Sequence, residues 1–409
     1  MAEQHEKALV PQIRFTSFTD PWEQRKLGEL TESYSGGTPA AGESEFYGGS
    51  IPFIRSAEIA AESTELFLTE KGYESSSARM VKPGDVLYAL YGATSGEVAV
   101  SRQKGAINQA ILAILPRDDC DARYITAWLR KQKGYIVTTY LQGGQGNLSG
   151  MIVKNLEVSI PSLPEQQKIG SMLSHLDSLI TLHQRKYDKL CVLKKSMLDK
   201  MFPKGGSLYP EIRFAGFTDP WEQRKLGEVA RRVTRKNENG DSDLPLTISA
   251  QYGLVDQRTF FNSQVASKDM NGYFLLHRGE FAYNKSTSTD SPWGAIKRLE
   301  KYDMGCVSTL YICFELLSGD PDFLVTYYET DRWYKSVQLI AAEGARNHGL
   351  LNIAPDDFFE TQICIPKRID EQRRIGAFFD RLDSLITLHQ RKLELLRNIK
   401  KSMLDKMFV

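Results

Sequence analysis

The sequence has few of the features that mark a metalloprotein, a disulfide-linked protein or a membrane protein. Its 409 residues include five cysteines and six histidines, with no CxxC or HExxH spacing among them. An odd number of scattered cysteines predicts reduced thiols, and we expect no structural metal site. No apolar run approaches the roughly 18 residues that would cross a bilayer, and the charged segment 1–12 does not resemble a secretory signal. We therefore expect a cytoplasmic protein.

Catalytic motifs are equally scarce. The segment 37–42 has the glycine spacing of a phosphate-binding loop, but Glu43 stands where that loop requires lysine. The sequence contains no GxGxxG opening of a dinucleotide-binding unit and no GxSxG nucleophile turn. Both copies of Asp-Pro-Trp fall short of the Pro-Pro-aromatic motif of amino-methyltransferases. We predict no catalytic residue, no cofactor and no metal in this chain, and interpret Asp177 and Asp383 as solvated or partner-facing charges.

Net charge is also small, at +1 from 52 basic and 51 acidic residues. This balance excludes a protein that is coated in positive charge and grips polyanions indiscriminately. It does not exclude nucleic acid, because local basic surfaces determine phosphate contacts.

What the sequence does contain is an internal repeat. LDSLITLHQRK at residues 176–186 recurs unchanged at 382–392, and KKSMLDKMF at 194–202 recurs at 400–408. Ahead of these copies, IRFTSFTDPWEQRKLGE at 13–29 returns as IRFAGFTDPWEQRKLGE at 212–228. The chain is therefore two tandem repeats, each with a matching opening, an unlike middle and a matching closing segment.

The unlike middles have a mixed pattern. In the first, short apolar runs at 51–54, 85–90 and 110–115 predict strands between Gly and Pro residues, and a helix is expected at about 122–135. The second middle is also rich in predicted strands, up to residue 365. Neither has the alternating rhythm of a parallel βαβ fold, so both middles are predicted to be α+β domains.

Each closing segment predicts one long helix. Apolar residues at spacings of three and four run from Ile169 to Met201 and again from Ile375 to Met407, which is typical of a coiled-coil seam. The first helix could extend over about 35 residues, or roughly 50 Å. His183 and His389 occupy the same place in the two seams, where a polar residue usually fixes register.

These elements predict the fold class: α+β, with two globular α/β domains separated by two long antiparallel coiled-coil helices and a pseudo-two-fold internal repeat. A single apolar stripe needs a partner helix, and an antiparallel pair avoids a long return connection. The predicted boundaries are a tail at 1–12, a first domain at 13–160, a central helix at 161–203, a second domain at 204–365 and a C-terminal helix at 366–409.

Two unlike domains on one spacer suit a long, regular ligand that is read at two places. Duplex DNA is such a ligand, because base edges recur in its grooves and half-sites lie about one turn apart. Two other interpretations remain open at this point. One is a scaffolding protein whose two domains bind protein or glycan ligands, and the other is an enzyme with an unrecognised site.

The chain resembles the specificity (S) subunit of type I restriction-modification systems. The resemblance is carried by the two FTDPWEQRKLGE openings, the helix starts IP…EQ at Ile160 and Ile365, the LDSLITLHQRK helices and YNKS at 283–286. It implies a non-catalytic subunit whose two middles are target-recognition domains for a bipartite, asymmetric double-stranded DNA site. It also implies two methyltransferase (M) subunits and restriction (R) subunits as partners, which carry S-adenosylmethionine, ATP and Mg.

Candidate DNA-binding residues lie in loops at matching places of the two domains. Each domain has a hydroxyl-rich loop after a strand and a loop rich in glycine and amides before its exit strand, and such side chains can contact phosphates and adenine edges. The candidates are Tyr91, Thr94, Ser95, Gln145 and Asn147 in the first domain, and Tyr283, Asn284, Lys285, Ser286, Thr287, Arg346 and Asn347 in the second. Arg102, Lys104, Lys297 and Arg298 are candidates for phosphate contact. The alternative is that these are polar, solvated turns without a ligand.

Overall fold

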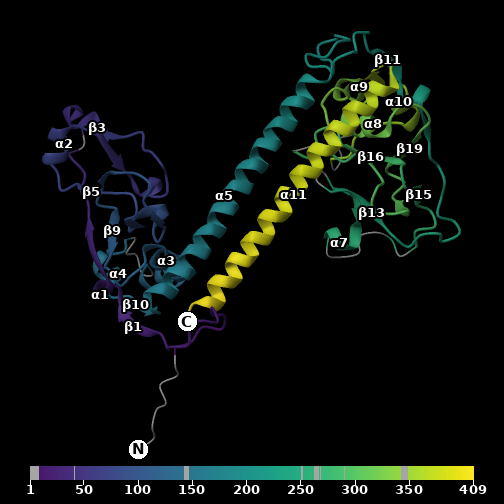
Figure 1. The fold of residues 1–409 in the computed structure, drawn as a ribbon. Helices are drawn as coiled ribbons and strands as arrows, with labels where there is room; N and C mark the ends of the chain where they lie inside the picture. Colours follow the sequence, from purple (N-terminus) through teal and green to yellow (C-terminus); the bar gives the residue numbers. More distant parts are fainter. Residues whose placement is uncertain are drawn as a thin grey trace, which may run out of the picture. The chain divides into compact units, whose positions relative to one another are not determined.

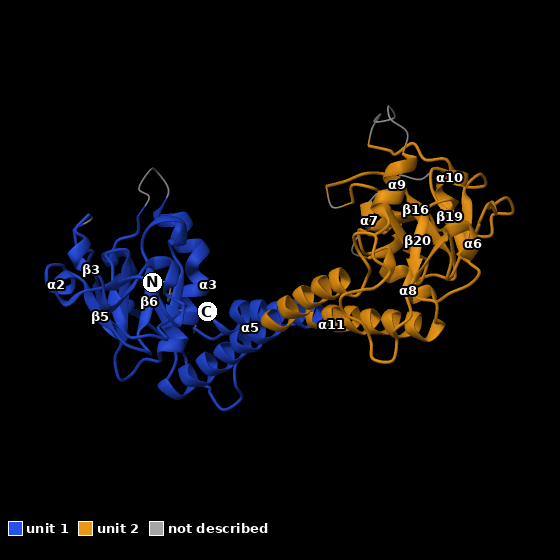
Figure 2. Ribbon diagram, turned by 90° about the horizontal axis from the view of Figure 1, so that it is seen from above, with its two compact units in different colours: residues 1–184, 390–409 blue, residues 185–389 orange. Residues whose placement is uncertain are grey.

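The computed structural model describes residues 9–40, 42–141, 147–249, 252–261, 267, 269–289, 291–341 and 349–409. The chain divides into two compact units (Figure 1, Figure 2). Unit 1 comprises residues 1–184 and 390–409, and unit 2 comprises residues 185–389. Both long helices change unit along their length. Among the described residues, no helix combines the length and apolarity needed to cross a membrane.

The domain of unit 1 is built on two four-stranded sheets. One has the strand order β2-β9-β6-β7 and the other β4-β3-β8-β5. The strands are β1 (Glu23–Lys26), β2 (Thr31–Ser35), β3 (Tyr47–Ile54), β4 (Phe67–Leu68), β5 (Arg79–Val81), β6 (Val86–Ala89), β7 (Val98–Val100), β8 (Gly105–Ile107), β9 (Ile111–Pro116) and β10 (Glu157–Ile160). The helices of the domain are α1 (Leu27–Leu30), α2 (Glu70–Glu74), α3 (Ala122–Tyr140) and α4 (Gly150–Lys154). All four residues of β6 are buried, because the strand lies inside its sheet and is covered on both faces.

The domain of unit 2 repeats this plan with a different periphery. Its four-stranded sheet has the order β12-β19-β16-β17, which matches β2-β9-β6-β7 of unit 1. The strands are β11 (Glu222–Lys225), β12 (Ala230–Arg232), β13 (Leu246–Ser249), β14 (Gly253–Asp256), β15 (Phe274–His277), β16 (Phe281–Asn284), β17 (Ala295–Arg298), β18 (Met304–Val307), β19 (Ile312–Leu316) and β20 (Gln362–Ile365). The helices are α6 (Leu226–Val229), α7 (Gln257–Phe261), α8 (Pro321–Tyr327), α9 (Tyr334–Ile340) and α10 (Pro355–Phe359).

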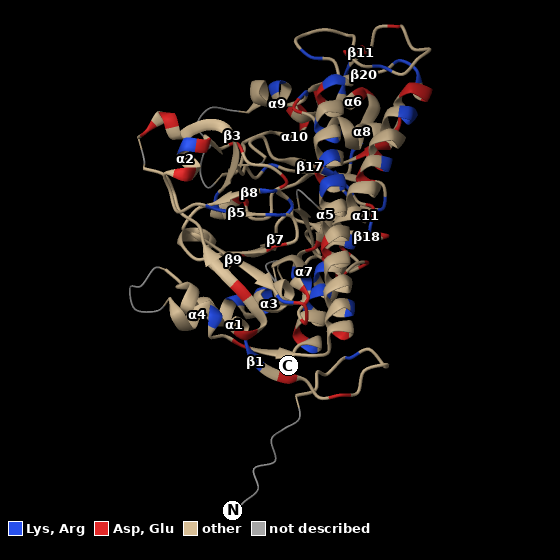
Figure 3. Ribbon diagram, turned by 60° about the vertical axis from the view of Figure 1, so that its left-hand side comes forward, with Lys and Arg blue, Asp and Glu red and all other residues tan. Residues whose placement is uncertain are grey.

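The two long helices are α5 (Leu163–Lys200) and α11 (Ile369–Met407), and they run antiparallel within each unit. In unit 1, Lys400 of α11 pairs with Asp177 of α5, and Arg397 donates to Gln184 at 2.9 Å. In unit 2, Lys194 of α5 pairs with Asp383 of α11 at 2.6 Å. Residue numbers fall along α11 as they rise along α5, as antiparallel helices require. Both acidic and basic residues occur along the two helices (Figure 3).

The matching openings and closings assemble into a common frame, which is the part of each unit that holds its domain on the helices. In unit 1, the opening strand β1 pairs antiparallel with the exit strand β10, with Glu23 opposite Ile160. The backbone N–H of Ile13 then donates to the carbonyl of Lys406 at the end of α11. The frame therefore joins the opening of the first repeat to the closing helix of the second repeat.

The frame of unit 2 is the counterpart of this arrangement. Strand β11 pairs with β20, with Glu222 opposite Ile365, and the N–H of Ile212 donates to the carbonyl of Lys200 at the end of α5. The last phenylalanine of each closing helix packs on the tryptophan of the opening: Phe408 on Trp22 at 6.5 Å between ring centroids, and Phe202 on Trp221 at 5.8 Å. The repeated sequences thus form the same set of contacts in the frames of both units.

The structure confirms the predicted fold class of two α+β domains and two long antiparallel helices. The predicted strands at 51–54, 85–90 and 110–115 overlap with β3, β6 and β9. The predicted helix at 122–135 is α3, which continues to Tyr140. The domain boundaries stay a prediction, since each compact unit takes in parts of both long helices.

Candidate functional site

In unit 1, the two predicted loops lie side by side. Strand β6 ends at Ala89, and the carbonyl of Leu90 accepts a hydrogen bond from the N–H of Leu148 at 3.0 Å. Tyr91 and Asn147 then form an isolated antiparallel bridge. This pairing joins the loop that follows β6 to the segment that precedes α4. We call the described residues 91–95 and 147–149 the loop pair of unit 1.

Unit 2 has the same arrangement. The carbonyl of Lys285, just after β16, accepts from the N–H of Leu351 at 3.0 Å, and Ser286 and Leu350 form the isolated bridge. Thr287 adds two bonds to the carbonyl of Gly349, from its N–H at 2.7 Å and from its hydroxyl at 3.0 Å. Residues 285–289 and 349–351 are the loop pair of unit 2. In each domain the structure therefore places the described end of the later predicted loop beside the loop that follows the central strand.

The register of the two loop pairs corrects the predicted correspondence. The bridge partner of Asn147 is Tyr91 and that of Leu350 is Ser286, so Ser286 is the counterpart of Tyr91. The sequence predicts Tyr283 at the head of the matching loop. Tyr283 is instead the counterpart of Tyr88, since both lie inside the central strand and both are fully buried.

Two predicted DNA-binding residues have no exposed side chain. Tyr283 is 0 % exposed, donates its hydroxyl to the carbonyl of Trp293 at 2.8 Å and stacks on Phe358. Burial raises the pKa of its phenol, so it lies in the core as a neutral residue. Ser95 is 8 % exposed, and its hydroxyl donates to the carbonyl of Leu90 at 3.0 Å. Both side chains are held inside the domain in this structure, and their assignment as DNA contacts stays a prediction.

The remaining described candidates lie on the surface of the loop pairs. Asn147 and Ser286 are exposed, and Tyr91, Thr94, Asn284, Lys285 and Thr287 are half-buried. The carboxamide oxygen of Asn284 accepts from the N–H of Ser286 at 3.0 Å, so it shapes the loop as well. Gln145, Arg346 and Asn347 lie outside the described residues. Gly92 has a φ of +72°, a left-handed conformation that favours glycine at this turn.

Lys285 is the residue that most distinguishes the two loop pairs. It stands where unit 1 has Leu90, which is 1 % exposed, because the carbonyls of both residues accept a hydrogen bond from the loop partner in the same register. Its ammonium donates to the carbonyl of Ile353 at 3.3 Å. Burial lowers the pKa of Lys285. Unit 2 thus holds a cation at the base of its loop pair, where unit 1 is apolar.

The basic residues proposed for phosphate contact fall into two groups. Lys297 and Arg298 are engaged inside unit 2: Lys297 lies 3.6 Å from Glu329, and Arg298 pairs with Glu300 at 2.7 Å and Asp322 at 2.6 Å. In unit 1, Arg102 pairs with Glu62 at 3.2 Å on the surface. Lys104 is exposed, and no carboxylate in the described part of the chain pairs with it.

The charged residues that hold each frame were not predicted from the sequence. Arg14 makes two hydrogen bonds to Glu165, at 2.8 and 2.7 Å, and the carboxylate is 0 % exposed. Arg213 holds Glu371 in the same way at 2.6 and 2.8 Å. The repeat itself was the available signal, since arginine and glutamate recur together at both places. The described residues offer no group of three His, Cys, Asp or Glu side chains that could hold a metal ion.

Comparison with known proteins identifies the architecture. Residues 19–191 match the family model described as type I restriction modification DNA specificity domain. The specificity subunit of the type I restriction enzyme MjaIX from Methanocaldococcus jannaschii is 27% identical over 233 residues, 53% of this chain and 53% of the relative. The EcoR124I/EcoR124II specificity subunit from Escherichia coli is 25% identical over 187 residues, 41% of this chain and 46% of the relative. The matches thus span about half the length of these relatives.

The fold agrees along the whole chain. The crystal structure of the type I restriction-modification S subunit from M. genitalium superposes with a TM-score of 0.62 and 13% identity, and covers 98% of this chain and 99% of that chain. This likeness defines the class as a two-domain protein on a pair of long helices. In sequence, residues 19–191 resemble the DNA specificity domain of type I restriction-modification systems, and the whole chain shares the fold of the M. genitalium S subunit.

Proposed function

We propose that this chain is the non-catalytic DNA-recognition subunit of a type I restriction-modification complex and reads a bipartite, asymmetric target. Each loop pair contacts one half-site. Two methyltransferase subunits bind the long helices and neighbouring domain surfaces, and restriction subunits complete the assembly. S-adenosylmethionine, ATP and Mg belong to those partners, since the sequence of this chain carries no recognisable catalytic motif.

One observation carries this proposal: two unlike loop pairs stand on two like frames. Tyr91 and Asn147 in unit 1, and Ser286 and Leu350 in unit 2, are bridged in the same register. The bridged residues differ between the units, since Tyr91 and Asn147 stand where unit 2 has Ser286 and Leu350. A common support with different exposed side chains is what two different half-site sequences require.

Selection from random DNA tests the proposal. We expect the full chain, purified with its methyltransferase partner, to retain duplex fragments that share two short motifs at a constant gap. The scaffolding alternative predicts no enrichment of DNA. Retention without any gapped motif, at low salt and with an active partner present, would contradict sequence-specific reading.

Replacing Lys285 by leucine tests the loop pair directly. Unit 1 shows that leucine fits this position, so Lys285→Leu is expected to leave the thermal stability of unit 2 unchanged or slightly raised. Binding to the selected DNA is expected to fall about ten- to hundredfold, which corresponds to one lost contact of roughly 1–3 kcal/mol. The change should concern the half-site of unit 2 and leave the other half-site as selective as before.

Lys225→Leu is the matched control, because it removes a lysine of unit 2 from the frame strand β11, where it pairs with Glu360 at 2.5 Å. It is expected to bind DNA like the unchanged chain. Equal losses for both variants would mean that net charge, and not the loop pair, determines binding.

A further inference from the structure

The helix pair presents the same two charges to both domains. In unit 1 these are Asp177 of α5 and Lys400 of α11, and in unit 2 they are Asp383 of α11 and Lys194 of α5. Each residue lies 206 positions from its counterpart, so the repeat generates both pairs. We call each Asp–Lys pair a docking pair. Every docking pair combines one negative and one positive charge.

The domains approach the docking pairs with opposite charges. In unit 1, Arg130 of α3 donates to Asp177 at 2.5 Å. In unit 2, Glu329 accepts from Lys194 at 2.7 Å. The contacts form the series cation–anion–cation in unit 1 and anion–cation–anion in unit 2.

Arg130 and Glu329 occupy the same place in their units. Asp121 caps α3 and Asp320 caps α8. The backbone N–H of each aspartate donates to a glutamine side chain of a long helix: Asp121 to Gln166 at 2.9 Å, and Asp320 to Gln372 at 2.8 Å. Arg130 and Glu329 both follow these caps by nine positions. The opposite charges therefore meet equivalent docking pairs.

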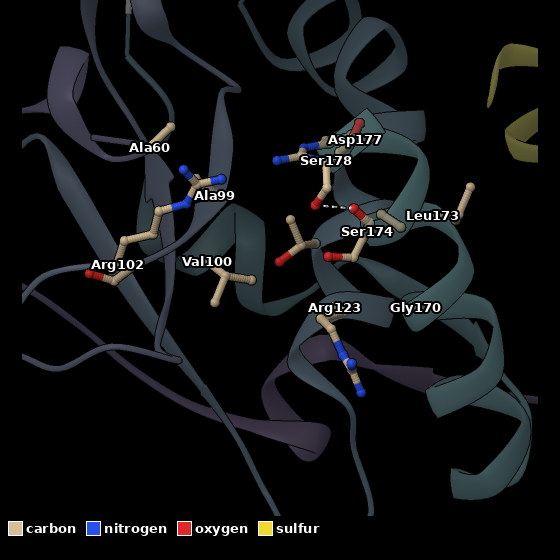
Figure 4. A pocket seen from close by; sticks show the side chains of 14 residues that line it. Ala60, Ala99, Val100, Arg102, Arg123, Gly170, Leu173, Ser174, Asp177 and Ser178 are labelled. Atoms are coloured by element: carbon tan, nitrogen blue, oxygen red, sulfur yellow. Dashed lines mark hydrogen bonds and ion pairs between the residues drawn. The ribbon is translucent and has the colours of Figure 1, made fainter. Parts of the chain in front are cut away.

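The residue next to the docking charge also differs between the two domains. Strand register places Lys297 opposite Ala282, and Ala99 opposite Leu87, at equivalent points of the two sheets. Lys297 lies 3.6 Å from Glu329, whereas the equivalent strand position in unit 1 holds the uncharged Ala99. In unit 1, Asp177, Arg130 and Ala99 line a surface hollow of about 290 Å³ (Figure 4).

These contacts are partly withdrawn from water. The side chains of Lys194 and Glu329 are 18 % and 22 % exposed. Burial alone would lower the pKa of Lys194, but Glu329 and Asp383 outweigh it and the pKa is raised. A charge that is lost here costs more than one on an open surface, because it leaves its partner in a poorly solvated place.

We propose that the docking pairs are positioning elements that hold each domain in its reading orientation and that each accepts a docking charge of either sign. Arg130 and Glu329 are positioning residues, not DNA contacts. The part that concerns reading rests on the proposed function. The neutral Asp–Lys composition explains how one repeated helix sequence supports two domains of opposite docking charge.

Charge inversion in unit 2 tests this inference in the full chain. Glu329→Arg with Lys297→Ala copies the charge set of unit 1, and the introduced arginine is expected to pair with Asp383. Glu329→Arg with Asp383→Asn has the same new cation but no carboxylate to receive it. Two measurements apply to both variants: hydrogen-exchange protection of α8 and β17, and binding with the methyltransferase partner to the DNA that the unchanged chain selects.

We expect the first variant to keep protection and DNA affinity within about threefold of the unchanged chain. The second is expected to lose affinity for DNA at least about tenfold, the effect of one lost partly buried ion pair, at a temperature where unit 2 stays folded. Equal losses in both variants, or no loss in either, would overturn the inference. If the unchanged chain selects no gapped motif, the proposed function fails, and hydrogen exchange alone decides whether the docking pair accepts either charge.

Discussion

Removing the guanidinium of Arg14 is expected to lower the free energy of unfolding of unit 1 by about 3–5 kcal/mol, because Glu165 would be left buried without its charged partner. Arg14→Met keeps an apolar side chain of similar length beside the opening strand. Glu165 is 0 % exposed, so water cannot replace the two lost hydrogen bonds. Hydrogen exchange resolved over unit 1 in the full chain measures the effect.

Arg213→Met is the matched variant in unit 2, and its cost is expected to be smaller. Glu371 also accepts a hydrogen bond from the indole N–H of Trp221 at 3.2 Å, whereas the indole N–H of Trp22 has no partner among the described residues. After the substitution, the buried carboxylate of unit 2 therefore keeps one side-chain hydrogen-bond donor, and that of unit 1 keeps none among the described residues. Replacing both members of the pair, as in Arg14→Met with Glu165→Met, should recover much of the loss, since no buried charge remains. An unchanged unit 1 after Arg14→Met would show that the pair contributes nothing to the frame.

The parts of the fold that repeat could be predicted from the sequence. A seam of apolar residues at spacings of three and four predicts a long helix that packs on a partner helix. Both long helices lie within the segments predicted for them. The sequence does not predict that the opening of each repeat joins the closing helix of the other repeat. Nothing local to the C-terminal segment indicates that it joins the opening of unit 1, where the N–H of Ile13 meets Lys406. Long-range pairing of this kind depends on tertiary packing.

The loop pairs were predictable in position and less so in detail. Glycine and hydroxyl-rich segments that follow an apolar run indicate exposed turns. That the two segments of each domain lie side by side was not predicted and is a finding of the structure. Whether a side chain at the edge of such a turn is exposed depends on the register of the strand, and a register shift of one residue is enough to change it. A shift of three positions separates the buried Tyr283 from Ser286, which is the residue bridged to Leu350. A one-residue shift already moves a side chain to the other face of a strand, so composition alone could not assign these contacts.

Lengthening the long helices is expected to change the gap of the DNA target and to leave both half-sites unaltered. Seven added residues make about two helical turns, or roughly 10 Å, and keep the following side chains on their original faces. The insertion belongs between Lys186 and Lys195 in α5, with an equal insertion between Lys392 and Lys401 in α11. With DNA rising 3.4 Å per base pair, the gap should widen by about one to three base pairs. Selection from random duplex fragments measures gap and half-sites together.

The paired insertion tests helix length more cleanly than an insertion in α5 alone, because the docking pairs join different parts of the two helices. Lys400 pairs with Asp177 in unit 1 and Lys194 with Asp383 in unit 2. Seven residues in one helix would put these two contacts out of register with each other, so the single insertion should bind DNA more weakly than the paired one. Replacing residues 30–160 by another target-recognition domain is the complementary change, and it should alter one half-site while the gap stays constant. If the paired insertion left the gap unchanged, the identical helices would serve to join subunits and would not set the distance between the half-sites.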